Sequence, residues 1–230
     1  MAPNIGSAAL CAIAALDAHP PFLNPHRRFM IITIASLKGG VGKTTTAVHL
    51  SAYLQHQADT LLIDAAPNHS ATGWGKRGSF PFDVVDEWSS PGDRRHYAHV
   101  VIDTQLRPKP DELLALAESC DLLLLPTTLD VLALDALVIL LENLKALGIT
   151  HYQLLLTLVP SKPSRDAEQI KTILTNAQLP LCTTSIRHLS VFQKAAQTGV
   201  LVYDLKEPKA LEAWDSYQQV GQELLLRSQP

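Results

Sequence analysis

The sequence predicts an α/β fold, a three-layer sandwich in which helices cover both faces of a mostly parallel sheet. From Met30 onward, short runs of leucine and β-branched residues alternate with stretches of helical periodicity, which is the pattern of successive βαβ units. The first of these runs leads through a glycine-rich loop into a helical stretch, the arrangement in which phosphate-binding loops occur. With 230 residues, of which 47% are hydrophobic, the chain can bury one substantial core.

Each strand is expected where an apolar run is short and bounded by turn residues. Strands are expected at residues 30–36, 60–64, 99–103, 121–126, 152–159 and, with a weaker pattern, 181–185. Helices are expected at residues 43–55, 111–117, 133–147, 164–176, 189–198 and 209–226. Because strands and helices alternate, the crossovers should be right-handed. The segment 73–96 is rich in Gly, Pro, Trp and charge, and is expected to form an exposed excursion over the functional edge of the sheet.

Residues 1–29 differ in composition from the rest of the chain. An alanine-rich stretch is followed by several prolines and two arginines, and basic residues are missing ahead of the apolar stretch, where a secretory signal would carry them. The prolines argue against tight packing of this segment. We therefore expect a poorly ordered N-terminal extension over residues 1–29 and one domain over residues 30–230.

Composition excludes several classes of protein. A net charge of −3 gives no overall attraction to nucleic acid or to an anionic membrane, so any such binding must be local. No apolar run approaches the ~20 residues that a membrane-spanning helix needs, which predicts a cytoplasmic protein without a membrane partner. Cys11, Cys120 and Cys182 lie far apart without metal-ligand spacing, and are expected to be buried, reduced thiols.

A phosphate-binding loop is expected at eight consecutive residues: Lys38, Gly39, Gly40, Val41, Gly42, Lys43, Thr44 and Thr45. The standard pattern requires glycine where this chain has Leu37, so the loop is of a deviant form. Its glycines still allow backbone N–H groups to converge on phosphate oxygens at a helix N-terminus. Lys43 would neutralise β- and γ-phosphate charge, and the Thr44 hydroxyl would ligate Mg²⁺. The loop therefore predicts binding of ATP with Mg²⁺.

Two aspartates end predicted strands close to this loop. Asp103 is expected to hold Mg²⁺ through water, because ligands of open α/β sheets bind at the carboxyl ends of the strands. Asp64 ends the preceding strand in the same way.

The loop resembles the deviant Walker A box of the ParA/MinD ATPases, which are P-loop NTPases. Segments 61–68, 100–104 and 124–128 extend the resemblance over the chain from Met30 to the C-terminus. The resemblance implies that Lys38 reaches across a homodimer to the partner's ATP, so that two nucleotides are sandwiched between the subunits. It also implies that Asp64 supports the magnesium and switch region.

The resemblance is closer to ParA than to MinD. The Asp-x-x-Pro-Asn and Asp-Thr forms are ParA-like, and the last helix is too acidic to resemble the basic membrane anchor of MinD-like proteins. Segments 102–108, 132–137 and 192–195 resemble the short cyanobacterial ParA-like proteins that distribute carboxysomes. The implied function is the positioning of an intracellular cargo, either carboxysomes or a plasmid.

Ala66 departs from the family pattern. ParA proteins usually carry an aspartate at this position, and that carboxylate is thought to position the attacking water. A methyl group cannot accept a proton, and losing such a group typically costs about 10²–10⁴ in rate. We expect ATP binding to survive and the ATPase to be deficient in hydrolysis. An engineered trapping substitution and a natural weak ATPase would each explain Ala66.

The resemblance further implies nonspecific binding to nucleoid DNA in the ATP state, and a small adaptor protein that stimulates hydrolysis. Residues 161–200 carry five basic and two acidic side chains, which is a modest basic patch. A solvated helix face explains this charge equally well. Lys76 and Arg77 could contact DNA or a partner. The candidate DNA contacts in the patch are Arg187, Lys194, Lys162 and Arg165.

Three other functions share parts of this pattern. A metabolic synthetase could use the same phosphate loop, although Lys38 argues against one. An iron–sulfur ATPase would need cluster cysteines at a dimer interface, whereas Cys120 begins a predicted buried strand. If Ala66 is native, the protein could be an ATP-dependent binding protein that barely turns over.

Overall fold

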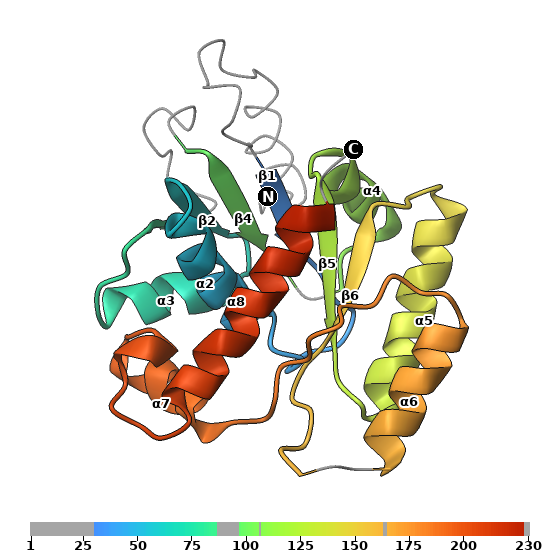
Figure 1. Cartoon of the computed structure of the whole chain (residues 1–230). Coiled ribbons are helices and arrows are strands. Elements are labelled where there is room, and N and C mark those ends of the chain that lie inside the picture. Colours follow the sequence, from blue (N-terminus) through green and yellow to red (C-terminus); the bar gives the residue numbers. More distant parts are fainter. Residues whose placement is uncertain (1–29, 87–96, 106, 163–164, 228–230) are drawn as a thin grey trace.

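The computed structural model describes residues 30–86, 97–105, 107–162 and 165–227, so the expected extension 1–29 lies outside the described residues. Six parallel strands form one sheet in the order β3-β2-β4-β1-β5-β6 (Figure 1). The strands are β1 (Met30–Ile34), β2 (Thr60–Asp64), β3 (Asp83–Asp86), β4 (His99–Asp103), β5 (Leu122–Thr127) and β6 (Tyr152–Leu156). The predicted α/β class with a parallel sheet is confirmed.

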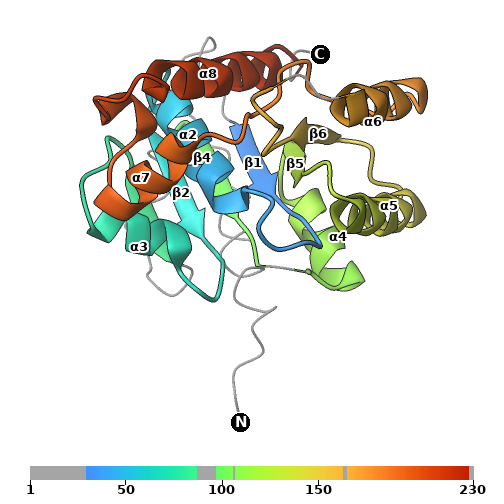
Figure 2. The same ribbon diagram turned by 90° about the horizontal axis from the view of Figure 1, so that it is seen from below.

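Helices pack on both faces of the sheet, as the three-layer prediction requires (Figure 2). One face carries α2 (Lys43–Gln55), α3 (Ser70–Lys76), α7 (Ser190–Thr198) and α8 (Ala210–Arg227). The other face carries α4 (Pro110–Glu118), α5 (Val131–Ala146) and α6 (Arg165–Asn176). A short 3-10 helix, η2 (Val202–Asp204), joins α7 to α8. None of the helices within the described ranges is long and apolar enough to cross a bilayer.

Both faces of each central strand are buried because helices cover both sides of the sheet, and successive side chains point to opposite sides. Ile32 of β1 belongs to the core under α2 and α8, whereas Ile31 belongs to the core under α4. In β5, Leu124 joins the first core while Leu123 and Leu125 join the core under α4 and α5. This explains why the strands read as continuous apolar runs rather than as alternating ones.

Two predictions about the edges of the sheet were wrong. The segment 181–185 is not a strand, because it forms only an isolated bridge from Leu181 to Leu154, and a second bridge joins Arg187 to Val159. The segment 73–96 is not simply an excursion, because it contains the end of α3 and all of β3, while residues 87–96 lie outside the described part. Trp74 is only 3% exposed, since it packs in the core under α2.

Candidate nucleotide-binding site

The predicted phosphate loop lies where neighbouring strands of the sheet lead to helices on opposite faces. The loop joins β1 to α2, which covers one face, whereas the strand beside β1 is β4, which is followed by α4 on the other face. The connections that follow β1 and β4 therefore run to opposite faces of the sheet, which leaves a crevice at the carboxyl ends of these two strands. Ile34 at the end of β1 pairs with Asp103 at the end of β4, so the loop and the aspartate meet at this crevice.

Two glycines give the loop its shape. Gly40 has a φ of 76° and Gly42 has a φ of 83°, a left-handed conformation that residues with a side chain rarely adopt. Gly42 is the N-cap of α2, and no side chain caps this helix end. The first backbone N–H groups of α2 are therefore available to an anion, as in other phosphate-binding loops.

A pocket of about 580 Å³ opens beside the loop, a size that suits a nucleotide. The predicted loop residues that line it are Gly39, Gly40, Gly42, Lys43, Thr44 and Thr45. Val41 points elsewhere, since it is 2% exposed and its carbonyl accepts a 2.8 Å hydrogen bond from the Thr157 hydroxyl. Residues that were not predicted as site residues complete the wall: Pro67, Asn68, Thr104, Thr157, Leu158, Ile186, His188, Leu189, Phe192, Gln193, Ala196 and Tyr217.

Thr44 and Asp103 meet at the bottom of the crevice. The Thr44 hydroxyl donates a 2.6 Å hydrogen bond to Oδ2 of Asp103. Asp103 is fully buried, and its Oδ1 has no hydrogen-bond partner among the described residues. The pKa of Asp103 is raised to about 6, mainly by burial and also by the charge of Asp64, while the hydrogen bond from Thr44 opposes the rise. Burial likewise lowers the pKa of Lys43, while the charge of Asp103 opposes that shift.

These groups fit a magnesium ion that a nucleotide brings with it. An unpartnered, buried carboxylate oxygen beside a hydroxyl suits a hard cation that retains water. Among the described residues there is no group of three or more His, Cys, Asp or Glu that could hold a metal alone. Phosphate oxygens and water would therefore have to complete the coordination, which is how Mg²⁺ usually binds in nucleotide sites.

Asp64 is engaged with the backbone that follows it. Its fully buried carboxylate accepts hydrogen bonds from the N–H of Thr72 at 2.7 Å and the N–H of Ala66 at 3.3 Å. The carboxylate therefore ties the end of β2 to the first turn of α3 and shapes the loop between them. Ala66 lines the pocket and is 8% exposed, so its methyl group forms part of the wall.

A buried histidine behind the pocket was missed by the sequence analysis. His49 lies one helical turn after Thr45, and its Nδ1 donates to the Thr45 carbonyl at 2.8 Å, because its Nε2 accepts from the N–H of Val202 at 3.4 Å. Its ring stacks on Tyr217 at a centroid distance of 5.0 Å. Burial lowers the pKa of His49 to about 4, opposed by the bond to Thr45. The only sequence signal was a histidine within the predicted helix 43–55, whose residues from Thr46 to Ala52 are all buried.

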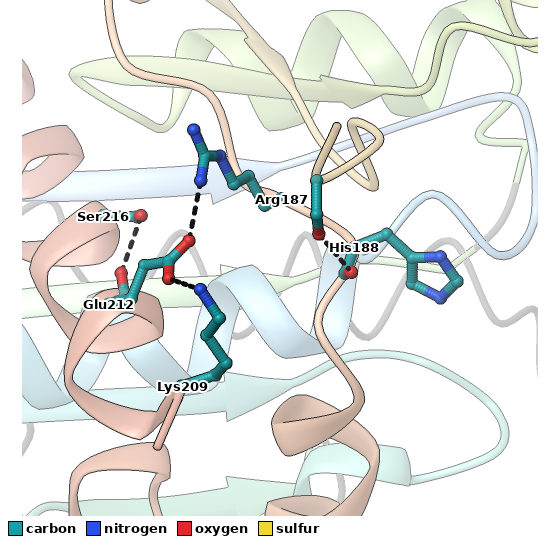
Figure 3. A network of polar contacts seen from close by, with 6 residues as sticks. Arg187, His188, Lys209, Glu212 and Ser216 are labelled. Atoms are coloured by element: carbon teal, nitrogen blue, oxygen red, sulfur yellow. Dashed lines mark hydrogen bonds and ion pairs between the residues drawn. The ribbon is translucent and has the colours of Figure 1, made fainter. Parts of the chain in front are cut away.

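The candidate DNA contacts differ in their surroundings. Arg187 donates to Glu212 at 2.9 Å, and Lys209 approaches the same carboxylate from the other side (Figure 3). Lys194 pairs with Glu207 at 2.7 Å. Lys162 and Arg165 are exposed near the start of α6. The basic patch of residues 161–200 is thus partly neutralised by acidic residues that lie beyond 200.

Arg77 is exposed, and its side chain also connects two helices of the fold. Its Nε and Nη2 both donate to the carbonyl of Ala196 at the end of α7, at 3.0 and 2.8 Å. Nearby, the indole N–H of Trp74 donates to the carbonyl of Val200 at 3.0 Å. These bonds connect α3, which follows the Ala66 loop, to α7, which carries Lys194.

The expectation of buried thiols is met by Cys182 and only in part by Cys120. Cys182 is buried, and Cys120 is partly buried; neither forms a disulfide. Burial raises the pKa of the Cys120 thiol to about 11 and that of Cys182 to about 12. Cys11 lies outside the described residues.

The chain is similar in sequence to a described family and to known proteins. Residues 32–202 match the family model described as the CobQ/CobB/MinD/ParA nucleotide binding domain. The chain is 31% identical over 201 residues to the maintenance of carboxysome distribution protein A of Gloeobacter kilaueensis, covering 84% of this chain and 93% of that protein. The protein of the same name from Halothiobacillus neapolitanus is 27% identical over 187 residues, covering 76% of this chain and 87% of that protein.

Solved structures confirm the fold. A plasmid partition protein from Borrelia burgdorferi bound to AMPPNP superposes with a TM-score of 0.67 at 20% identity, covering 87% of this chain and 99% of that one. An aspartate-to-alanine variant of McdA from Cyanothece in complex with ATP gives a TM-score of 0.69 at 19% identity, covering 87% and 97%.

Proposed function

Because this chain belongs to the CobQ/CobB/MinD/ParA nucleotide-binding family, we propose that it is a ParA-type ATPase that positions carboxysomes. The observation that carries the proposal is the meeting of Lys43, Thr44 and Asp103 beside an open helix N-terminus. The carboxysome assignment rests on the two relatives named for carboxysome distribution. A plasmid is the second candidate cargo, supported by the likeness to a partition protein.

In the proposed site the phosphates of ATP lie against the backbone N–H groups of the loop. Lys43 supplies positive charge from a partly buried position, where its charge is screened less than at the surface. The Thr44 hydroxyl and Asp103 would hold Mg²⁺, Asp103 through water, and the ion would offset phosphate charge when bound. The base would lie at the other end of the pocket, near Leu158 and His188.

Dimerisation through Lys38 is the second part of the proposal. Lys38 does not line the pocket of its own subunit, although Gly39 and Gly40 next to it do. The pKa of Asp130 is lowered by a hydrogen bond from Thr128 and, to a smaller extent, by the charge of Lys38. This position beside the pocket but outside it supports the proposal that Lys38 serves a nucleotide held by a second copy of the chain.

Hydrolysis is proposed to be slow. Ala66 lies in the pocket wall where a carboxylate could orient water, and its methyl group offers neither an acceptor nor a base. The proposed resting state is therefore an ATP-bound dimer. A protein that binds ATP and barely turns over is the second candidate function, and it rests on this residue alone.

DNA and adaptor binding complete the proposal. In the ATP-bound dimer, Arg187, Lys194, Lys162 and Arg165 of two subunits would contact phosphates of nucleoid DNA without sequence preference. DNA phosphates would have to replace Glu212 and Glu207 as partners of Arg187 and Lys194, so binding should be weak and sensitive to salt. A small adaptor on the cargo is proposed to stimulate hydrolysis and release.

The ATPase unit is proposed to be residues 30–230, with residues 1–29 dispensable, since the family match begins at residue 32. A shortened chain that begins at Met30 should bind ATP as tightly as the whole chain. A loss of affinity on shortening would contradict this boundary.

The proposed function is tested by ATP-dependent dimerisation, measured by light scattering at fixed protein concentration. Lys43→Ala should abolish both ATP binding and the dimer, because it removes the charge that faces the phosphates. Lys38→Ala should bind ATP as a monomer and fail to dimerise. A dimer that persists in Lys38→Ala would contradict the cross-subunit role.

A further inference from the structure

Arg107 adopts a backbone conformation that an arginine rarely takes. Its φ is 58°, in the left-handed region, and it directly precedes Pro108. Residues with side chains hold such conformations only where the surroundings impose them, and this happens most often at functional sites. The arginine lies in the segment that leaves β4 after Asp103, close to the phosphate loop.

Two hydrogen bonds from Arg107 hold the start of the phosphate loop. Its backbone N–H donates to the carbonyl of Ser36 at 3.3 Å, and its side-chain Nε donates to the carbonyl of Leu37 at 3.2 Å. Both acceptors immediately precede Lys38. The left-handed backbone allows one residue to reach two successive carbonyls on the neighbouring segment.

Further contacts fix the other groups of the segment from Ser36 to Lys38. The hydroxyl of Ser36 accepts from the N–H of Lys38 and donates to its carbonyl, both at 3.1 Å. The side chain of Leu37 packs against the core under α4 and α5. With Arg107 holding the two free carbonyls, the backbone from which the Lys38 side chain projects has little freedom.

We infer that Arg107 is a positioning residue for Lys38, holding the backbone so that the ammonium is presented to the nucleotide of the partner subunit. This inference rests on the proposed cross-subunit role of Lys38. A long lysine side chain loses much freedom when it docks on a partner, and a fixed backbone reduces the remaining cost of ordering. Arg107 is absent from the residues that line the pocket of its own subunit, so it acts through Lys38.

The test compares two uncharged replacements of Arg107. Arg107→Gln places an amide N–H where the arginine has Nε, so the bond to Leu37 can form without the charge. Arg107→Asn accepts the left-handed backbone more readily but is too short to reach Leu37. The dissociation constant of the ATP-dependent dimer is measured by light scattering, with ATP affinity of the monomer and the melting temperature as further readouts.

Arg107→Asn should weaken the dimer at least ten-fold, with monomer ATP affinity within two-fold of the parent and an unchanged or higher melting temperature. Arg107→Gln should stay within about three-fold of the parent. In the Lys38→Ala background, Arg107→Asn should cause no further loss, because the residue that it positions is already gone.

Three results would overturn the inference. The first is an undiminished dimer in Arg107→Asn. The second is an equal loss in Arg107→Gln and Arg107→Asn, which would mean that the charge itself contacts a phosphate. The third is an additional loss in the Lys38→Ala background. If the parent protein fails to dimerise with ATP, or Lys38→Ala still dimerises, the proposed function fails instead, so the two failures are distinguishable.

Discussion

The Thr44 hydroxyl and the Asp103 carboxylate are joined by a 2.6 Å hydrogen bond that connects the first turn of α2 to the end of β4. The bond satisfies Oδ2 and leaves the buried Oδ1 without a partner among the residues described. Leaving such an oxygen unsatisfied is costly, and a hydrated cation at this point would offset the cost. The pair therefore couples the loop to the strand in advance of Mg²⁺ binding.

Asp103→Asn should remove the effect of Mg²⁺ on ATP binding. The amide oxygen can still accept from Thr44, but the charge that would attract the ion is lost. We expect the affinity for ATP with Mg²⁺ to fall at least ten-fold, which is about 1.4 kcal/mol, and the affinity without Mg²⁺ to change little. Calorimetric titration with and without Mg²⁺ measures both, and a loss that is equal in the two conditions would contradict the assignment.

Ala66→Asp should restore hydrolysis. The new carboxylate would face the pocket and could orient water, so the rate should rise by about 10²–10⁴ while ATP affinity stays similar. Ala66→Asn is the matched control, because it has the same shape without a basic carboxylate. ADP formation by the purified variants is measured. An unchanged rate in Ala66→Asp would contradict the proposed effect of Ala66 on hydrolysis.

His49 should make the stability of the protein depend on pH. Its pKa is lowered by burial from 6.5 to about 4, so the folded state holds the neutral form while the unfolded chain takes up a proton below pH 6.5. The contribution of neutral His49 to the stability of the folded state is fully present above pH 6.5 and is lost as the pH falls towards 4. At pH 5 the loss relative to pH 7 is about 2 kcal/mol.

The pH dependence of the parent protein alone does not isolate His49, because Asp103 changes the stability of the folded state in the opposite direction. Its pKa is raised by burial to about 6, so acidification through that value stabilises the folded state. Urea unfolding of the parent and of His49→Asn between pH 7 and pH 5 isolates the histidine. The difference in stability between the two should shrink by about 2 kcal/mol on acidification. Parallel curves would show that the histidine does not titrate in this way.

Glu212→Gln should strengthen DNA binding. The change removes the carboxylate that pairs with both Arg187 and Lys209, so both cations become available to phosphates (Figure 3). Nonspecific DNA affinity in the presence of ATP should rise several-fold and its salt dependence should steepen. Stability should change by less than about 1 kcal/mol, because exposed ion pairs contribute little.

Fluorescence anisotropy with a random duplex at several salt concentrations provides the measurement. Glu212→Gln combined with Arg187→Gln is the control, and it should return the affinity towards that of the parent. An affinity that does not respond to Glu212→Gln would place the DNA contact elsewhere.

The parallel sheet and the candidate nucleotide site could be predicted because both depend on local sequence. The apolar runs and the helical periodicity between them do not require knowledge of distant residues. The order Gly-x-Gly-Lys-Thr between a strand and a helix likewise implies a phosphate loop through local backbone geometry. Asp103 could be placed beside the loop because parallel strands end at one edge.

The two wrong predictions at the edges of the sheet, at β3 and at residues 181–185, have a different cause. β3 has only four residues, and its first and last are aspartates, so it lacks an apolar run. It is a strand because β2 offers it a ladder of parallel partners, from Leu61 with Asp83 to Asp64 with Asp86. The segment 181–185 carried strand-like residues but forms only a bridge, since pairing depends on the neighbouring strand rather than on propensity.

The sequence alone determined the fold class and the glycine-rich loop that is the candidate phosphate site, because each is written in adjacent residues. Only the tertiary structure decided the rest of the site. It placed His49 behind Thr45, paired Arg187 with Glu212 and laid Arg107 over the carbonyls that precede Lys38. These are contacts between residues 4 to 70 positions apart, and all but the first depend on how the chain returns to the same edge of the sheet.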